Sequence, residues 1–478
     1  MRLTLLTLLM GTGLALFAQQ PKIMTLQECV DLAVQNNLNV QRSKLNLETA
    51  EVNKMQADFQ RFPTLNANGS YGTAFGRSID PFSNQITTQQ LNQSSASLNS
   101  SMVLYNGGQI SNSIKQNDKD AEAALYDLDK AKNDVQINVV TFYLNVIFNQ
   151  ELLENARFQL ASSQDQLERT KKLVEAGSLP RTNELELISQ VSTNELNLIN
   201  AENSLNLAKL NLKQVMLLPA NENIEVVRPD FEVEQLLVTS STEEVFSISE
   251  STMPEIRSVD ARVESSEYGY QASVGGRYPT LTLNGSLSTS YSSAANRPRQ
   301  FFDGTQIVPV EIGYLGSNPS ELVYTDAEVP ILVSTDDNFS FFEQYRDNQR
   351  KFISLNLSIP IFNGHQTTAN IQRSKISMQQ ASINAMEQRN LLRQTIETAF
   401  NDAQAASKSY AAAEKQVSSL EETFRSVENQ FNNGAANATD LQVAQNNLYR
   451  AKSDLTRAKF DFIFKKKLLD FYQGKSIF

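Results

Sequence analysis

The stretch RFPTLNANGS at residues 61–70 decides the fold, because it occurs a second time as RYPTLTLNGS at residues 277–286. The second copy starts 216 residues after the first (61 to 277). Further along, Tyr-Asn-Gly at 105–107 matches Phe-Asn-Gly at 362–364, and this pair is 257 residues apart (107 to 364). Motifs that recur in the same order indicate an internally duplicated chain.

The two offsets also locate an insertion. Gly177 and Gly434 repeat the 257-residue offset, so no net insertion separates them from the preceding motifs. The increase from 216 to 257 places 41 additional residues in the second copy, between its first and second motifs. We divide the chain into a signal peptide at 1–18, a first repeat at 19–218, a linker at 219–242, a second repeat at 243–472 and a tail at 473–478.

Four segments around these motifs alternate apolar and polar residues with period two, as amphipathic β-strands do. Each is about 10 residues long, the length of a tilted strand that crosses a membrane. Strands in lipid must close into a barrel, and single-chain barrels begin at about eight strands. We therefore expect several copies to share one barrel, unless the segments form two amphipathic hairpins on a soluble core. The apolar positions are Leu65, Ala67, Gly69, Tyr71, Phe75, Ala96, Leu98, Met102, Leu104, Leu281, Leu283, Leu287, Tyr291, Ile353, Leu355, Leu357, Ile359 and Ile361.

Apolar residues then follow a spacing of four and three from Ala121 to Val174, and again from Met378 to Phe431. Neither stretch contains Gly or Pro. With its flanking residues, each helix should be about 65 residues long, near 95 Å at about 1.5 Å per residue. A seven-residue repeat of this length implies left-handed supercoiling against neighbouring helices. A plain coiled-coil rod would explain these helices, but it would not explain the strands.

Two glycines are expected to end the long helices. Glycine is the usual residue where a helix terminates in a left-handed turn, so Gly177 and Gly434 mark two helix tips. Thr182 and Thr439 are suitable caps for the helices that return from these tips. The loops at 76–94 and 292–351 each join two predicted membrane strands, and we expect both loops to face the cell exterior.

Composition and termini narrow the function further. The chain has 53 acidic and 42 basic residues, a net charge of -11 that argues against a nucleic-acid binder. Arg2, the apolar stretch 3–17 and Ala18 predict a signal peptide, rather than a buried helix. The sequence LQEC at 26–29 is not a lipidation site, because Glu28 stands where a small residue belongs.

No catalytic chemistry is indicated. Cys29 is the only cysteine and His365 the only histidine, so neither can belong to a Cys/His metal set. The sequence also lacks a phosphate-binding glycine loop. We expect no enzyme activity and no cofactor.

The duplicated order of helix, strand pair, long helix, glycine loop and helix resembles the TolC-like outer membrane efflux proteins. The resemblance runs from Thr25 to about Tyr472. It is carried by Arg-Phe/Tyr-Pro at 61–63 and 277–279, Asn-Gly at 106–107 and 363–364, and the tip loops 177–183 and 434–440. It implies a mixed α and β membrane protein: a homotrimer with a 12-stranded β-barrel, four strands per chain, continued by a long periplasmic α-helical barrel.

The resemblance also implies a location and partners. The protein would lie in the outer membrane lipid of a Gram-negative bacterium, with a periplasmic extension. It would be the passive duct of a tripartite efflux or type I secretion system and would bind a periplasmic adaptor (membrane fusion) protein and an inner-membrane pump. The implied adaptor-docking residues at the tips are Gly177, Ser178, Leu179, Thr182, Gly434, Ala435, Ala436 and Thr439.

The family closes its tunnel near the tips with hydrogen bonds and ion pairs. Asp440 occupies the family's acidic position, Asn183 is its equivalent in the first repeat, and Arg181 would supply a cation. Asp440 could equally be an ordinary acidic residue at a helix start, where the helix dipole favours it. Two other functions remain open at this point: a periplasmic coiled-coil adaptor and a secreted coiled-coil structural protein.

Overall fold

The computed structural model describes residues 22–79, 86–87, 90–228, 241–293, 299–315, 320, 322–335 and 340–475. The predicted signal peptide lies outside these residues. The chain divides into two compact units, each formed from separate stretches of sequence. The helical unit contains residues 1–54, 115–268 and 373–478, and the strand unit contains residues 55–114 and 269–372.

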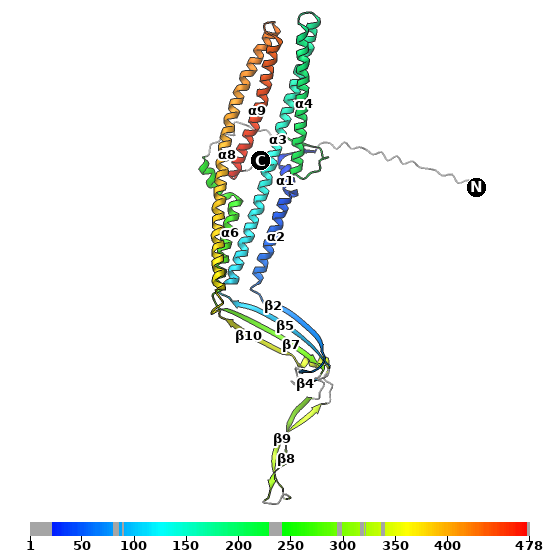
Figure 1. Cartoon of the computed structure of the whole chain (residues 1–478), viewed down its shortest axis with the longest axis vertical. Coiled ribbons are helices and arrows are strands. Elements are labelled where there is room, and N and C mark those ends of the chain that lie inside the picture. Colours follow the sequence, from blue (N-terminus) through cyan, green and yellow to red (C-terminus); the bar gives the residue numbers. More distant parts are fainter. Residues whose placement is uncertain are drawn as a thin grey trace, which may run out of the picture. The chain divides into compact units, whose positions relative to one another are not determined.

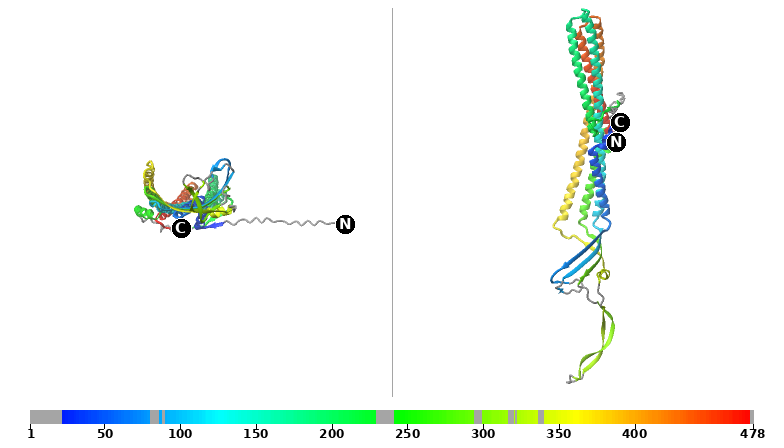
Figure 2. Two further views of the ribbon diagram at one scale, coloured as in Figure 1. Left: turned by 90° about the horizontal axis from the view of Figure 1, so that it is seen from below. Right: turned by 90° about the vertical axis from the view of Figure 1, so that its right-hand side faces the viewer.

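Two long helical hairpins dominate the helical unit (Figure 1, Figure 2). The first consists of α3 (Gln109–Glu175) and α4 (Arg181–Val215), and the second of α8 (Gln366–Asn432) and α9 (Ala438–Tyr472). The long helices have 67 residues each and the return helices 35 each. Every start and end in the second hairpin is 257 residues after its counterpart, so the predicted duplication is confirmed. The long helices run without a break because neither contains Gly or Pro.

Four shorter helices repeat with the other offset. α1 (Leu26–Asn36) and α2 (Leu38–Phe59) correspond to α5 (Thr242–Thr252) and α6 (Pro254–Gly275), each 216 residues later. In the described part of the chain, no helix is long and apolar enough to span a membrane.

The main core of the helical unit lies where α1, α3, α4 and α9 meet. Tyr143 is almost fully buried there, and its hydroxyl donates hydrogen bonds to the main-chain oxygens of Val227 (2.6 Å) and Met24 (3.3 Å). Those oxygens flank a short parallel pair, β1 (Lys22–Met24) and β6 (Ile224–Val226). Strand β6 belongs to the predicted linker, so Tyr143 fastens both the start of the first repeat and its end to the middle of α3.

The strand unit contains one four-stranded antiparallel sheet, in the order β10-β7-β5-β2. Its strands are β2 (Thr64–Ala74), β5 (Leu91–Tyr105), β7 (Thr280–Ser292) and β10 (Arg350–Ser358). All four predicted strands are present. The last is shorter than expected, because β10 ends at Ser358 and leaves Ile359 and Ile361 outside the sheet. Pro360 follows directly, and proline restricts the preceding residue and has no N–H to donate to a ladder.

The 41-residue insertion has structure that the sequence analysis did not predict. It contains an antiparallel pair, β8 (Arg299–Tyr314) and β9 (Leu322–Thr335), followed by the short helix α7 (Phe341–Asp347). Gln344 of α7 is fully buried and fixes this helix to β7, because its side chain bonds both the N–H and the carbonyl oxygen of Ser292. The first loop contains only the two-residue strands β3 (Ser78–Ile79) and β4 (Ile86–Thr87).

Candidate functional site

The sheet of the strand unit has one polar and one apolar face, as the period-two pattern predicts. The pairing register places side chains of the same kind beside each other, for example Asn99 beside Ser286 and Leu98 beside Leu287. The polar strand face consists of Asn68, Ser70, Ser95, Ser97, Asn99, Ser101, Thr282, Asn284, Ser286, Ser288, Ser354 and Asn356. The apolar strand face includes Leu65, Ala67, Leu98, Met102, Leu283, Leu287, Ile353, Leu355 and Leu357.

Hydrogen bonds between side chains cross the polar strand face from strand to strand. Ser286 donates to Asn99 (2.9 Å) and Ser101 donates to Asn284 (2.9 Å), both between β5 and β7. Ser70 and Ser95 are bonded at 2.7 Å between β2 and β5. This face carries short, uncharged polar groups, which suit contact with water.

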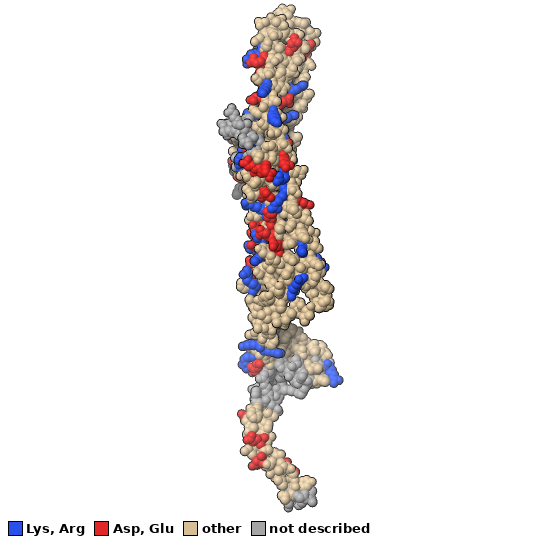
Figure 3. All heavy atoms as spheres, turned by 90° about the vertical axis from the view of Figure 1, so that its left-hand side faces the viewer, with Lys and Arg blue, Asp and Glu red and all other residues tan. Residues whose placement is uncertain are grey.

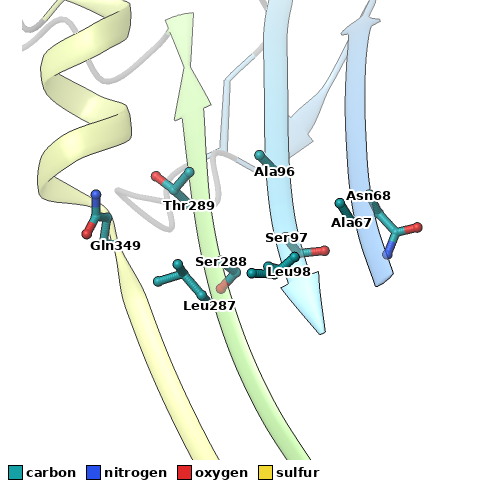
Figure 4. Close-up of a pocket in the computed structure, with 9 residues that line it drawn as sticks. All are labelled: Ala67, Asn68, Ala96, Ser97, Leu98, Leu287, Ser288, Thr289 and Gln349. Carbon is teal, nitrogen blue, oxygen red and sulfur yellow. The ribbon is translucent and has the colours of Figure 1, made fainter. Parts of the chain in front are cut away.

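The apolar strand face is largely uncovered in the single chain. Ile353 is 81% exposed and Leu65 is 67% exposed, although both would be buried in a globular core. Small side chains at Ala67 and Ala96 leave a shallow hollow beside Leu98 and Leu287 (Figure 4). Exposed apolar area of this extent marks a surface that contacts lipid or another protein.

Both outer strands of the sheet have an unpaired edge within the described residues. β2 pairs only with β5, and β10 pairs only with β7. Their outer backbone N–H and C=O groups are therefore available to strands from another chain. One chain supplies a strip of barrel wall with two open sides.

The two helix tips have the same backbone geometry. Gly177 and Gly434 have φ values of 73° and 74°, in the left-handed region that the sequence analysis assigned to them. At each tip the glycine N–H bonds the carbonyl three residues earlier, and the next N–H bonds the carbonyl five residues earlier. This is the Schellman pattern, which satisfies the last carbonyls of a helix.

The predicted caps of the return helices were wrong. The N-cap of α4 is Pro180, which makes no side-chain hydrogen bond, so Thr182 lies inside the first turn. The N-cap of α9 is Asn437, not Thr439. Asn437 and Asp440 form a capping box, because the Asn437 side chain accepts from the Asp440 N–H (2.8 Å) and the Asp440 carboxylate accepts from the Asn437 N–H (3.4 Å). Both caps therefore lie two residues earlier than we expected.

The three candidate gate residues lie near the tips but do not contact one another within this chain. Arg181 and Asp440 are exposed, and Asn183 is half-buried. Among the ion pairs between described residues, none joins Arg181 to Asp440. Of the candidate docking residues, Leu179 and Ala436 are half-buried, whereas Gly177, Ser178, Thr182, Gly434, Ala435 and Thr439 are exposed.

A buried polar contact between the two hairpins was not anticipated. Asn194 of α4 donates to the Ser163 hydroxyl of α3 (2.9 Å), and both residues are almost fully buried. Gln190 of α4 reaches across to Asn446 of α9 (3.3 Å), and Gln445 of α9 donates to Ser162 of α3 (3.1 Å). Gln190 also accepts from Gln442 of α9. We call these seven residues the polar seam; their signal in the sequence was the run of Gln and Asn among the apolar positions of the return helices.

Charged residues gather in a band on the helical unit (Figure 3). Arg389 of α8 bonds Asp260 of α6 (2.8 and 2.9 Å) and Glu250 of α5 (3.0 Å). One helical turn later, Arg393 pairs with Glu243 at 2.9 Å and lies over the ring of Phe246. These contacts hold α5 and α6 against the second long helix.

Titratable groups give no sign of catalytic chemistry in the described residues. Burial raises the pKa of the Cys29 thiol to about 12, which keeps it protonated and unreactive near neutral pH. Burial likewise raises the pKa of Glu255. No group of three or more His, Cys, Asp or Glu side chains that could hold a metal ion occurs in the part of the chain that the structure describes.

The comparisons with known proteins agree with this architecture. The family model described as outer membrane efflux protein matches residues 29–216 and 247–462. Among solved structures, the outer membrane protein VceC from Vibrio cholerae is 14% identical with a TM-score of 0.72, covering 95% of this chain and 97% of that one. The MtrE outer membrane channel of Neisseria gonorrhoeae is 18% identical with a TM-score of 0.67, covering 94% and 88%.

A third channel gives the same result. The CmeC outer membrane channel of Campylobacter jejuni is 16% identical with a TM-score of 0.66, covering 94% of this chain and 86% of that one. A comparison with curated protein sequences finds no match. At these identities the solved structures establish the fold, and the family model covers most of both repeats.

Proposed function

Because this chain belongs to the outer membrane efflux protein family, we propose that it is the outer-membrane duct of a tripartite efflux or type I secretion system. Its family and fold make it an efflux channel of the outer membrane of a Gram-negative bacterium, with a helical extension in the periplasm. The family consists of channel proteins rather than enzymes. The adaptor and structural-protein alternatives do not account for the family match.

The observation that carries this proposal is the two-faced sheet with two unpaired edges. A strand in the hydrocarbon region needs about 9–11 residues, and the four strands of the sheet have 9 to 15. Open edges are not tolerated in lipid, so the free edges of β2 and β10 must pair with other copies. Three copies would supply 12 strands, with the apolar strand face toward lipid and the polar strand face toward a water-filled lumen.

The helix tips are proposed as the docking and closing end of the duct. The two tips share one backbone geometry, so a trimer would present six similar loops to a periplasmic adaptor, which in turn binds an inner-membrane pump. The small exposed residues Ser178 and Ala435 allow close approach by such a partner. Asp440, Asn183 and Arg181 would face neighbouring copies, because they do not pair within one chain.

The polar seam would assist closing and opening. Its hydrogen bonds join the two hairpins through side chains, and such bonds can be exchanged for bonds to water at a modest net free-energy change. An entirely apolar contact would resist separation of the hairpins more strongly. The seam is therefore a suitable place for the two hairpins to part.

Site-specific photo-crosslinking in intact cells tests the docking proposal. A photoreactive residue at Ser178 or Ala435 should capture a periplasmic protein, whereas one at the exposed position Glu387, in the middle part of α8, should capture much less. Equal capture at all three positions, or capture at Glu387 alone, would contradict docking at the tips. Loss of this protein should also make the cells sensitive to the compounds or proteins that the system exports.

A further inference from the structure

The pair β8–β9 is an isolated two-stranded ribbon. Figure 1 shows the two strands running together, and among the described elements they have extensive contacts only with each other. A two-stranded hairpin without a third strand or a covering helix is at best marginally stable in water. The ribbon nevertheless keeps a continuous register from Thr305 to Glu311, opposite Pro330 to Tyr324. A covering surface must therefore come from elsewhere.

The register gives the ribbon two chemically different faces. One carries Val308, Val310, Val323, Ala327 and Val329, and we call it the valine ribbon face. The other carries three carboxylates, Glu311, Asp326 and Glu328, which Figure 3 shows in part as the acidic side chains of this segment. Among the side chains described on the ribbon there is no Lys or Arg to neutralise them. The acidic face belongs in water, and the valine ribbon face is the one that needs a cover.

Prolines restrict how the ribbon can be covered. Pro309 lies opposite Asp326, and Pro330 lies opposite Thr305, so each strand carries one proline. Proline has no N–H and is accommodated in a strand where that group would point away from the partner strand. Both outer edges of the ribbon are thus blocked against the addition of another strand. Covering by face-to-face packing remains.

We propose that the valine ribbon faces of three copies of this chain pack against one another around the threefold axis of the trimer. This inference rests on the proposed function, because it requires the trimer. The occupant is a second copy because the ribbon is inserted between β7 and β10, and β10 provides one of the edges that must meet another copy. Identical ribbons are then brought together automatically, and the carboxylates of each stay outside the contact.

Adjacent residues of β8 offer a matched test. Val308 lies on the valine ribbon face, and Ile307 lies on the acidic face, where it is 67% exposed. The variants Val308→Cys and Ile307→Cys would be treated with copper phenanthroline on intact cells, and subunit dimers would be measured on a non-reducing gel. Cys29 does not interfere, because it is buried and its thiol pKa is raised.

The proposal expects Val308→Cys to give mostly disulfide-linked subunits and Ile307→Cys to remain mostly monomeric on the gel, while both extract as trimers. Equal linkage of the two variants, no linkage of Val308→Cys in an intact trimer, or its linkage to a different protein would overturn the ribbon contact and leave the duct standing. Absence of a trimer in the unmodified protein would overturn both. As a second readout, Val310→Asp should make the ribbon sensitive to protease on intact cells without loss of the trimer; unchanged resistance contradicts the proposal.

Discussion

At the scale of single residues, Gly434 makes the sharpest demand on the sequence. Its φ of 74° lies in the region where a side chain with a Cβ costs about 1–2 kcal/mol. No atom outside the local backbone approaches its position, so this cost comes from backbone strain and not from a clash. We predict that Gly434→Val distorts the tip and weakens export, with a trimer yield near that of the unmodified protein.

The neighbouring residue supplies the control. Ala435→Val adds the same side chain one position later, where the backbone is not left-handed. Export should be affected less by Ala435→Val than by Gly434→Val, as measured by the accumulation of a transported compound in cells. If the two variants weaken export equally, the tip needs a small surface and not a left-handed turn.

Asp440 can be separated from its capping role in the same way. Asn437→Ala removes the capping box and should destabilise the start of α9 by about 0.5–2 kcal/mol, but it keeps the carboxylate. Asp440→Ala removes both the box and the charge. If Asp440 closes the channel, only Asp440→Ala should raise single-channel conductance or lower cation preference in planar bilayers. If both variants behave alike, Asp440 is a helix-start acid and the gate lies elsewhere.

The cap residues also show where sequence reasoning stops at this scale. Asn437 and Thr439 are both good cap formers and lie two residues apart. The choice between them depends on the path of the chain after the left-handed turn at Gly434, which no local preference encodes. The left-handed glycines themselves were predictable, because glycine adopts that conformation far more readily than any other residue.

At the scale of elements, the charged band makes a prediction about stability. Arg389→Gln removes the cation between Glu250 and Asp260 and should lower the stability of the helical unit by about 1 kcal/mol, since these pairs are partly exposed. The deficit should shrink in 1 M salt, where charges are screened within about 3 Å. Arg425→Gln is the control, because its pair with Glu422 is exposed and lies within one helix.

The melting temperature of the detergent-solubilised protein at low and high salt would measure this effect. Arg389→Gln should melt earlier than Arg425→Gln at low salt, and the two should converge at high salt. A difference that is insensitive to salt would mean that Arg389 contributes through packing and not through its charge.

Elements with a strong period were predictable, and those without one were not. The long helices keep a seven-residue pattern without a Gly or Pro, so α3 and α8 could be placed from the sequence. The four strands of the sheet were evident from alternation of apolar and polar residues. The ribbon β8–β9 was missed, because prolines and register shifts interrupt its alternation and neither of its faces is buried in the single chain.

At the scale of the whole molecule, the duplication was the most predictive feature. The offsets of 216 and 257 residues in the motifs recur at the starts and ends of eight helices, so two repeats of one plan could be inferred without coordinates. The polar seam could not be inferred, because it joins α3 and α4 to α9 across the repeats and depends on how the hairpins pack. Contacts between copies of the chain are one level further from the sequence.

The central claim is that several copies complete one barrel, since a single chain supplies a sheet with two free edges. Native mass spectrometry of the protein extracted from outer membranes in mild detergent tests it most directly. We predict a single species near three times the 53.4 kDa chain, less the signal peptides. A uniform monomer that still conducts ions in a planar bilayer would contradict the account.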